Sequence, residues 1–212
     1  PRFDVRACIV APPGYKLVEA DLSGAEGWIT AAASRDLDLL DKLRAGFDLH
    51  TWTAAYVLTR MGRATTPEQI TPFERQVFGK VPRHALNYGM QPPTLQREIN
   101  FIADVTGIAV TAAQAKLIYE GYHALHPRLR IWWEDVLNQV VVRGTLTTCF
   151  GRKRTFYGRN RGEWLGDTHK SAIAQEPQAT IADLLNRGLL RWWRQHDGKV
   201  GELIAQVYDS ML

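Results

Sequence analysis

Two aspartates follow short apolar segments near opposite ends of this 212-residue chain. Asp21 closes the segment Leu17–Asp21, and Asp209 follows Leu203–Val207. Both segments have strand character, so one sheet would bring the two carboxylates together. Carboxylate oxygens suit Mg²⁺, and two such ions can clamp the attacking and leaving oxygens of a phosphoryl transfer. Taken singly, each aspartate equally suits a helix cap or a turn, so the pair leaves both interpretations open.

A second group recurs every four residues. Lys80, His84 and Tyr88 would share one face of a helix that we expect from about Pro82 to Met90. A cation, an imidazole and an aromatic ring near a helix N-terminus suit a triphosphate and its sugar. The alternative is an amphipathic helix with a solvated basic edge and a packed tyrosine.

The positive charge of the chain is concentrated in one stretch. Gly151–Lys170 holds six Lys and Arg residues against two acidic residues, an excess equal to the net charge of +4 for the whole chain. Phe156, Tyr157 and Trp164 are interleaved with these charges. Such a stretch could neutralise backbone phosphates and stack on bases. A solvated hairpin is the alternative.

The composition and the absence of several motifs exclude a number of protein classes. Apolar residues make up 45% and charged residues 23%, which excludes a disordered chain. No apolar run approaches a membrane span, no signal sequence is visible, and Cys8 and Cys149 are the only cysteines. We therefore expect a cytoplasmic protein without a membrane partner. Neither a Walker phosphate loop nor a dinucleotide fingerprint occurs, and His123 and His126 lack a third zinc ligand.

The elements that must position these residues favour an α+β fold. A capping box at Thr111–Gln114 predicts the start of a helix, and Gly151–Lys153 indicates the turn of a hairpin. Pro92-Pro93 is expected to end the preceding helix. Strands are expected at 17–21 and 202–207, a hairpin over 145–157, and helices at 28–33, 37–43, 51–58, 82–90, 117–125, 129–142 and 169–195.

In this order the segments resemble the catalytic region of family A DNA polymerases, the bacterial DNA polymerase I type. The first motif, D-x-S-x-x-E, is similar to Asp21–Glu26, and the second, R-x-x-x-K-x-x-N-[FY]-G, to Lys80–Gly89. Val207–Ser210 stands in the place of the third motif, V-H-D-E. Three further segments match family patterns at compatible spacing: Phe47–Thr51, Phe150–Arg154 and Pro177–Asp183.

The resemblance implies a role for each matching residue. Asp21 and Asp209 would bind two Mg²⁺ ions with help from the backbone carbonyl of Leu22. Glu26 would lie beneath the sugar and exclude a 2′-hydroxyl, and Tyr88 would pack on the deoxyribose and nascent base pair. Lys80 and His84 would contact the triphosphate, with His50 near the phosphates. The residues expected to contact primer–template DNA are Arg152, Lys153, Arg154, Lys170 and Gln178.

The resemblance also implies an architecture and an activity. Residues 1–27 and 197–212 would belong to the palm, with a small antiparallel sheet, and residues 28–196 to the mostly helical fingers and the helix that returns to the palm. The expected reaction is template-directed transfer of a deoxynucleotide from a dNTP to a primer 3′-hydroxyl. The alternative is a non-catalytic module that binds primer–template DNA. We expect the chain to be a fragment with little activity alone.

Five positions depart from the family pattern. Lys80 and His84 stand where the family has Arg and Lys, and Trp28 and Pro92 replace an Arg and a Tyr. An ammonium cannot make the paired contacts of a guanidinium, and a neutral histidine carries no charge. Ser210 removes the second carboxylate of the third motif. Because both aspartates are retained, we interpret the chain as a divergent, phage-type polymerase rather than an inactive one.

Overall fold

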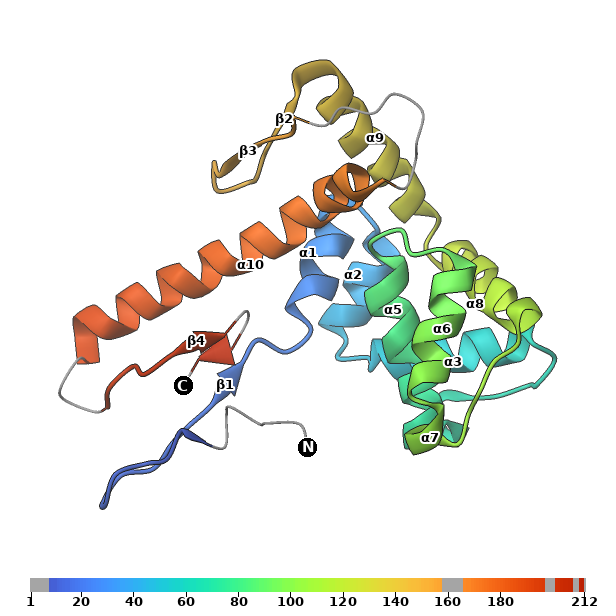
Figure 1. Cartoon of the computed structure of the whole chain (residues 1–212), viewed down its shortest axis with the longest axis horizontal. Coiled ribbons are helices and arrows are strands. Elements are labelled where there is room, and N and C mark those ends of the chain that lie inside the picture. The colour runs from blue at the N-terminus through green and yellow to red at the C-terminus, as the bar shows by residue number, and fades with distance from the viewer. Residues whose placement is uncertain (1–7, 158–165, 197–200, 208–209, 212) are drawn as a thin grey trace.

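Helices dominate the computed structural model, which describes residues 8–157, 166–196, 201–207 and 210–211 (Figure 1). The α-helices are α1 Ala25–Ala33, α2 Leu37–Arg44, α3 Leu49–Arg60, α4 Pro72–Glu74, α5 Val81–Leu86, α6 Pro92–Phe101, α7 Ala103–Thr106, α8 Ala112–Leu125, α9 Pro127–Arg143 and α10 Asp167–His196. A 3₁₀-helix, η2, covers Pro67–Gln69, and a π-helix, η3, covers Arg75–Lys80. The strands are β1 Ala20–Asp21, β2 Thr145–Thr147, β3 Lys153–Thr155, β4 Gln206–Val207 and β5 Ser210–Met211.

Two small antiparallel sheets give the α+β fold that the sequence indicates. The first has the order β1-β5-β4 and joins segments from the two ends of the chain. Its register pairs Ala20 with Met211 and Asp21 with Ser210. Strand β1 begins only at Ala20, later than expected. The second sheet is the predicted hairpin, in which Thr145 pairs with Thr155.

Local signals place several helix boundaries correctly. The backbone N–H of Gln114 donates to Thr111 Oγ1 at 3.2 Å, and the Gln114 side chain accepts from the Thr111 N–H at 2.8 Å. This capping box starts α8. Helix α9 ends where Gly144 adopts a left-handed φ of 68°, which favours glycine. Helix α10 extends over 30 residues and passes from the helical body toward the β1-β5-β4 sheet (Figure 1).

The segment around the second motif differs from expectation. The helix predicted over 82–90 ends at Leu86, and Gly89 has a left-handed φ of 76°. Pro92 does not simply terminate a helix but begins α6, because a proline in the first turn has no N–H to leave unpaired. Helices α6 and α7 were not predicted.

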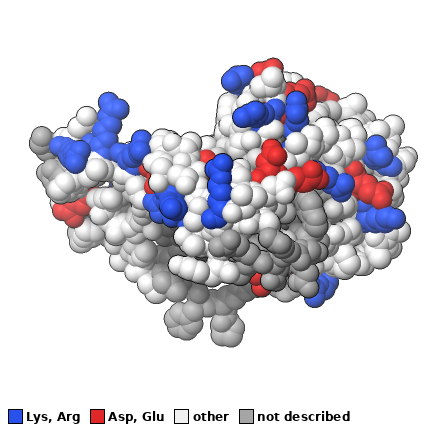
Figure 2. Space-filling view, turned by 90° about the horizontal axis from the view of Figure 1, so that it is seen from above, with Lys and Arg blue, Asp and Glu red and all other residues white. Residues whose placement is uncertain are grey.

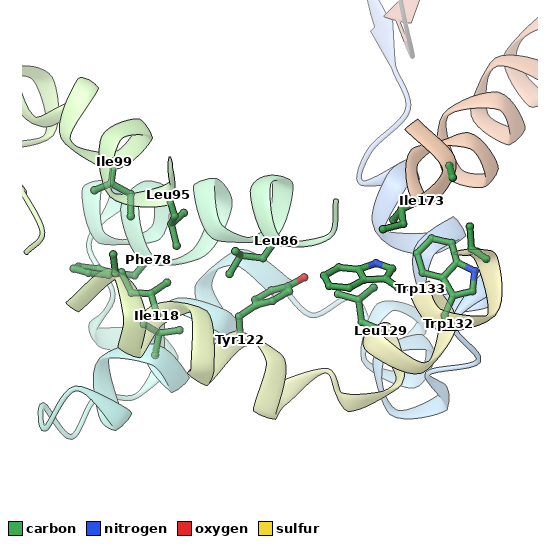
Figure 3. Packing of buried hydrophobic residues seen from close by; sticks show 14 of the residues in the cluster. Phe78, Leu86, Leu95, Ile99, Ile118, Tyr122, Leu129, Trp132, Trp133 and Ile173 are labelled. Carbon is green, nitrogen blue, oxygen red and sulfur yellow. The ribbon is translucent and has the colours of Figure 1, made fainter. Parts of the chain in front are cut away.

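One hydrophobic core connects the helical body to α10. Leu86, Leu95, Ile99, Ile118 and Tyr122 are almost completely buried, and Figure 3 shows Tyr122 beneath Leu86 with its hydroxyl directed toward Trp133. Trp132 and Trp133 lie in the same cluster as Ile173 of α10. Within the described residues, no helix is both long and apolar enough to cross a membrane.

Candidate functional site

The predicted stripe of Lys80, His84 and Tyr88 lies on three consecutive backbone elements. Lys80 is the last residue of η3, His84 lies on α5, and Tyr88 follows α5 in a turn. Lys80 and His84 are exposed, whereas Tyr88 is half-buried against the core. The helical backbone is continuous from η3 into α5, so Lys80 and His84 lie one turn apart, as predicted.

Glu26 of α1 faces this stripe. Its Oε2 lies 3.8 Å from His84 Nδ1. The contact with His84 and, to a smaller extent, the neighbouring Tyr88 lower the pKa of the Glu26 carboxyl despite its partial burial. Burial and the Glu26 charge raise the pKa of the Tyr88 phenol. At neutral pH the site therefore holds an ionised carboxylate beside a protonated phenol whose oxygen has no hydrogen bond of ordinary length within the described part of the chain.

His50 completes this group from the first turn of α3. Its ring centroid lies 5.8 Å from that of His84. Burial lowers the pKa of His50 to about 4, assisted by the positive charges of Arg83 and Arg75, so the imidazole is neutral at pH 7. Four of the five predicted nucleotide-binding residues thus lie together: Glu26, His50, His84 and Tyr88.

Close packing fixes the position of His50 relative to η3. A Cβ atom added to Gly79 would lie 2.0 Å from the His50 carbonyl oxygen. Only a glycine allows this approach of two backbones. The residue before Lys80 is therefore locked onto the first turn of α3, where the Asp48 side chain accepts hydrogen bonds from the N–H groups of His50 and Thr51.

One of the two predicted metal-binding aspartates, Asp21, lies at the β1-β5-β4 sheet. Asp21 is exposed on β1, and the Leu22 carbonyl accepts a 3.4 Å hydrogen bond from Ala25 at the start of α1. Asp209 lies outside the described residues. Within the described part, the Asp21 carboxylate has no ion-pair partner, and no three His, Cys, Asp or Glu side chains are grouped as a metal site. Mg²⁺ is commonly held by one or two carboxylates together with substrate phosphates, so a single unpaired carboxylate fits that mode of binding.

The β2–β3 hairpin is fastened to α10 by its basic residues. The Arg152 guanidinium donates to Asp183 at 3.1 and 3.2 Å, and Arg154 donates to Gln175 at 3.2 Å while stacking on Phe156. These two arginines therefore position the hairpin. Lys153, Lys170 and Gln178 are exposed.

The aromatic residues of the basic stretch differ in accessibility. The expectation that Phe156 could stack on a base is wrong, because its ring is buried in the hydrophobic core. Tyr157 is 92% exposed, whereas Arg159, Arg161 and Trp164 lie outside the described residues. On the face of the molecule shown in Figure 2, Lys and Arg side chains gather with few acidic residues over the part where α10 and the β2–β3 hairpin lie in Figure 1.

Sequence reasoning missed the polar residues on the inner side of α5. Arg83 and Asn87 are buried, and four-residue spacing places them on one face, as it does for Lys80 and His84 on another. Tyr122 donates a hydrogen bond to the Asn87 side chain, and Trp133 Nε1 donates to the Asn87 carbonyl at 3.1 Å. The spacing of Arg83 and Asn87 was the available signal, but a buried arginine is not expected from sequence.

Comparison with known proteins agrees with the arrangement of these segments. DNA polymerase I of Pseudomonas aeruginosa is 30% identical over 213 residues, which cover 98% of this chain and 22% of that protein. The thermostable DNA polymerase I of Thermus thermophilus is 27% identical over 210 residues, covering 98% of this chain and 23% of that protein. The chain thus spans less than a quarter of the length of these relatives.

A solved structure shares the fold. The polymerase domain of Pol1 from M. smegmatis, in complex with DNA primer-template and dNTP, superimposes with a TM-score of 0.74 at 22% identity, covering 91% of this chain and 32% of that one. The family model described as DNA polymerase family A matches residues 2–212. The chain therefore belongs to DNA polymerase family A.

Proposed function

We propose that this chain is part of the catalytic region of a DNA-directed DNA polymerase. The primer 3′-hydroxyl attacks the α-phosphate of a dNTP selected by the template, a new phosphodiester bond forms, and pyrophosphate leaves. The observation that carries the proposal is the antiparallel pairing of Asp21 with Ser210. It joins the strand of the first motif to the strand of the third, immediately before the helix that holds Glu26.

The carboxylates of Asp21 and Asp209 would hold two Mg²⁺ ions, with the Leu22 carbonyl as a further oxygen ligand. When bound, such ions stabilise charge on the attacking and leaving oxygens. Asp209 directly precedes Ser210 in sequence, and the pairing of Ser210 with Asp21 supports a shared site. The Asp21 carboxylate is exposed, and no ion pair with another described residue occupies it, so it could accept such an ion.

The α5 stripe would bind the nucleotide. Lys80 and His84 would contact the triphosphate, where the exposed ammonium of Lys80 supplies a charge that the neutral His50 does not. Glu26 would lie under the sugar and exclude a 2′-hydroxyl, while Tyr88 packs on the deoxyribose. The contact with His84 lowers the pKa of the Glu26 carboxyl, so the residue expected under the sugar and a residue expected at the phosphates touch each other.

Primer–template DNA would lie along the basic part of α10 and the hairpin. Lys153 and Lys170 would contact phosphates and Gln178 would contact the duplex near the primer end. Arg152 and Arg154 would act largely by holding the hairpin, because one is paired with Asp183 and the other is bound to Gln175. In this proposal residues 1–27 and 197–212 form palm segments around the β1-β5-β4 sheet, and residues 28–196 form the fingers and the helix that returns from them.

Primer extension tests the proposal. In the full-length protein, Mg²⁺-dependent extension should be lost in Asp21→Ala and in Asp209→Ala, while primer–template binding persists. If either variant keeps most of the activity, the metal-ligand assignment is wrong. The 212-residue chain alone should extend primers poorly, because it spans less than a quarter of its relatives.

A second function is favoured by one residue. Ser210, which stands where the family has a carboxylate, is buried in the sheet. A chain that binds primer–template DNA without any extension by the intact protein would be a binding module on a polymerase scaffold. Extension by the wild-type protein excludes that alternative.

A further inference from the structure

A buried arginine lies directly behind the proposed nucleotide-binding stripe. Arg83 adjoins His84 on α5, yet it is 4% exposed. Its Nη1 lies 3.4 Å from Nε2 of His126, the residue at the start of α9, which is 3% exposed. The Nδ1 atom of His126 lies 3.5 Å from Oδ2 of Asp36. Three elements distant in sequence thus meet in one chain of polar contacts.

Hydrogen-bond chemistry fixes which atoms donate and which accept along this series of contacts. A guanidinium only donates, so Nε2 of His126 must be the acceptor and the ring proton must lie on Nδ1, toward Asp36. Burial lowers the pKa of His126, which keeps the ring neutral between a cation and an anion. Asp36 is itself fixed, because its Oδ1 accepts from the Leu39 N–H at 3.1 Å and caps α2.

Helix α1 packs beside the arginine. A Cβ atom on Gly27 would lie 3.5 Å from Arg83 Nη2. The preceding residue, Glu26, contacts His84. Two consecutive residues of α1 therefore lie against two consecutive residues of α5, one pair near the surface and the other deeper. The Glu26–His84 contact is half-exposed and belongs to the proposed nucleotide site, whereas Arg83 beside Gly27 is buried.

The cost of burying the charge points to a role beyond stability. An arginine and an aspartate that are bridged by a neutral ring gain less than a direct ion pair, and apolar side chains of similar volume often stabilise a core equally well. Directional donors, however, fix the rotation and translation of the helix that carries them. Asn87, one turn later, is held in the same way by Tyr122 and Trp133.

We propose that Arg83, His126 and Asp36 are positioning residues, which hold α5 so that Lys80 and His84 face the incoming triphosphate. This proposal rests on the function proposed above. None of the three side chains touches the nucleotide. They act through the backbone of α5, and the chain of contacts from Asp36 to Arg83 ties that helix to the N-termini of α2 and α9.

The first experiment uses the 212-residue chain and needs no activity. ¹⁵N NMR of the histidine rings at pH 7 should show His126 protonated on Nδ1 only. In Arg83→Met, amide hydrogen exchange in α5 should accelerate about tenfold while α8 is unchanged. Arg97→Met, an exposed change on α6, is the matched control and should alter neither signal. A His126 protonated on Nε2, or unchanged exchange in α5, overturns the proposal.

The second experiment measures single-nucleotide insertion by the full-length protein, with dATP and Mg²⁺ opposite a template thymine. Arg83→Met, His126→Phe and Asp36→Asn should each raise KM for dATP about tenfold, with kcat and DNA affinity changed less than about twofold. Asp36→Asn keeps the helix cap and removes only the charge. A fall in kcat or DNA affinity at constant KM contradicts positioning. If the wild type inserts nothing, the proposed function fails, and hydrogen exchange alone decides the positioning claim.

Discussion

A methyl group added at Gly79 would collide with the backbone of α3. The new Cβ would lie 2.0 Å from the carbonyl oxygen, 2.7 Å from the carbonyl carbon and 3.1 Å from the Cα of His50. The φ angle of Gly79 lies outside the left-handed region, so alanine suits the local backbone and only the neighbour forbids it. We therefore predict that Gly79→Ala is strongly destabilising, because neither backbone can rotate away as a side chain would.

The size of the effect follows from this geometry. Ordinary contact requires the two backbones to separate by about 1 Å or more in a close-packed interior. Overpacking usually costs about 1–3 kcal/mol when side chains can adjust, so we expect about 3 kcal/mol here. For a chain of this length, that loss lowers the melting temperature by roughly 6–12 °C.

Urea and thermal unfolding of the 212-residue chain measure this loss directly. Gly188→Ala is the matched control, since nothing lies within 4 Å of a Cβ at that position in the exposed part of α10. Alanine there should stabilise the helix by about 0.5–1 kcal/mol. The reasoning is refuted if Gly79→Ala unfolds within about 1 kcal/mol of the wild type.

Three further substitutions test other parts of the structure. The hydrogen bond from the half-exposed Arg63 holds the pKa of Glu74 at about 2, so its stabilisation is present above the ordinary value of 4.5 and lost as the pH falls from there toward 2. Urea unfolding should show Glu74→Gln about 2 kcal/mol less stable at pH 7 but equal to the wild type near pH 2; a constant difference contradicts this. Tyr122→Phe should cost about 1–3 kcal/mol in the same assay, because the buried Asn87 side chain loses its donor; an unchanged midpoint argues against that bond. In the full-length protein, His84→Lys should lower KM for dNTP about fivefold by adding a charge-assisted contact; an unchanged KM removes His84 from the triphosphate site.

Signals within a few residues predicted the structure best. The Thr111–Gln114 capping box and the Gly151 turn fix their own geometry through local hydrogen bonds, and both elements form where expected. Pro92 was misinterpreted, because the same proline that ends one helix is also the preferred first residue of the next. Pro92 begins α6 because the left-handed backbone at Gly89 has already separated α5 from α6.

Contacts between segments distant in sequence could not be predicted from the residues alone. Phe156 is buried because its ring joins the hydrophobic core, with the Arg154 guanidinium stacked on it, which residue type alone does not reveal. Likewise, Arg83 is buried where His126, which lies 43 residues away, approaches from α9. Family resemblance supplied the order of the motifs but not these contacts.

The role of Asp21 in metal-dependent nucleotide transfer can be measured by Mg²⁺-dependent single-nucleotide extension of a labelled primer by the full-length protein, compared with its Asp21→Ala variant at saturating primer–template. We expect extension by the wild type and a loss of about a thousandfold or more in the variant, with primer–template affinity changed by less than about threefold. Extension by Asp21→Ala at a rate near that of the wild type would show that Asp21 does not bind the catalytic metal ions.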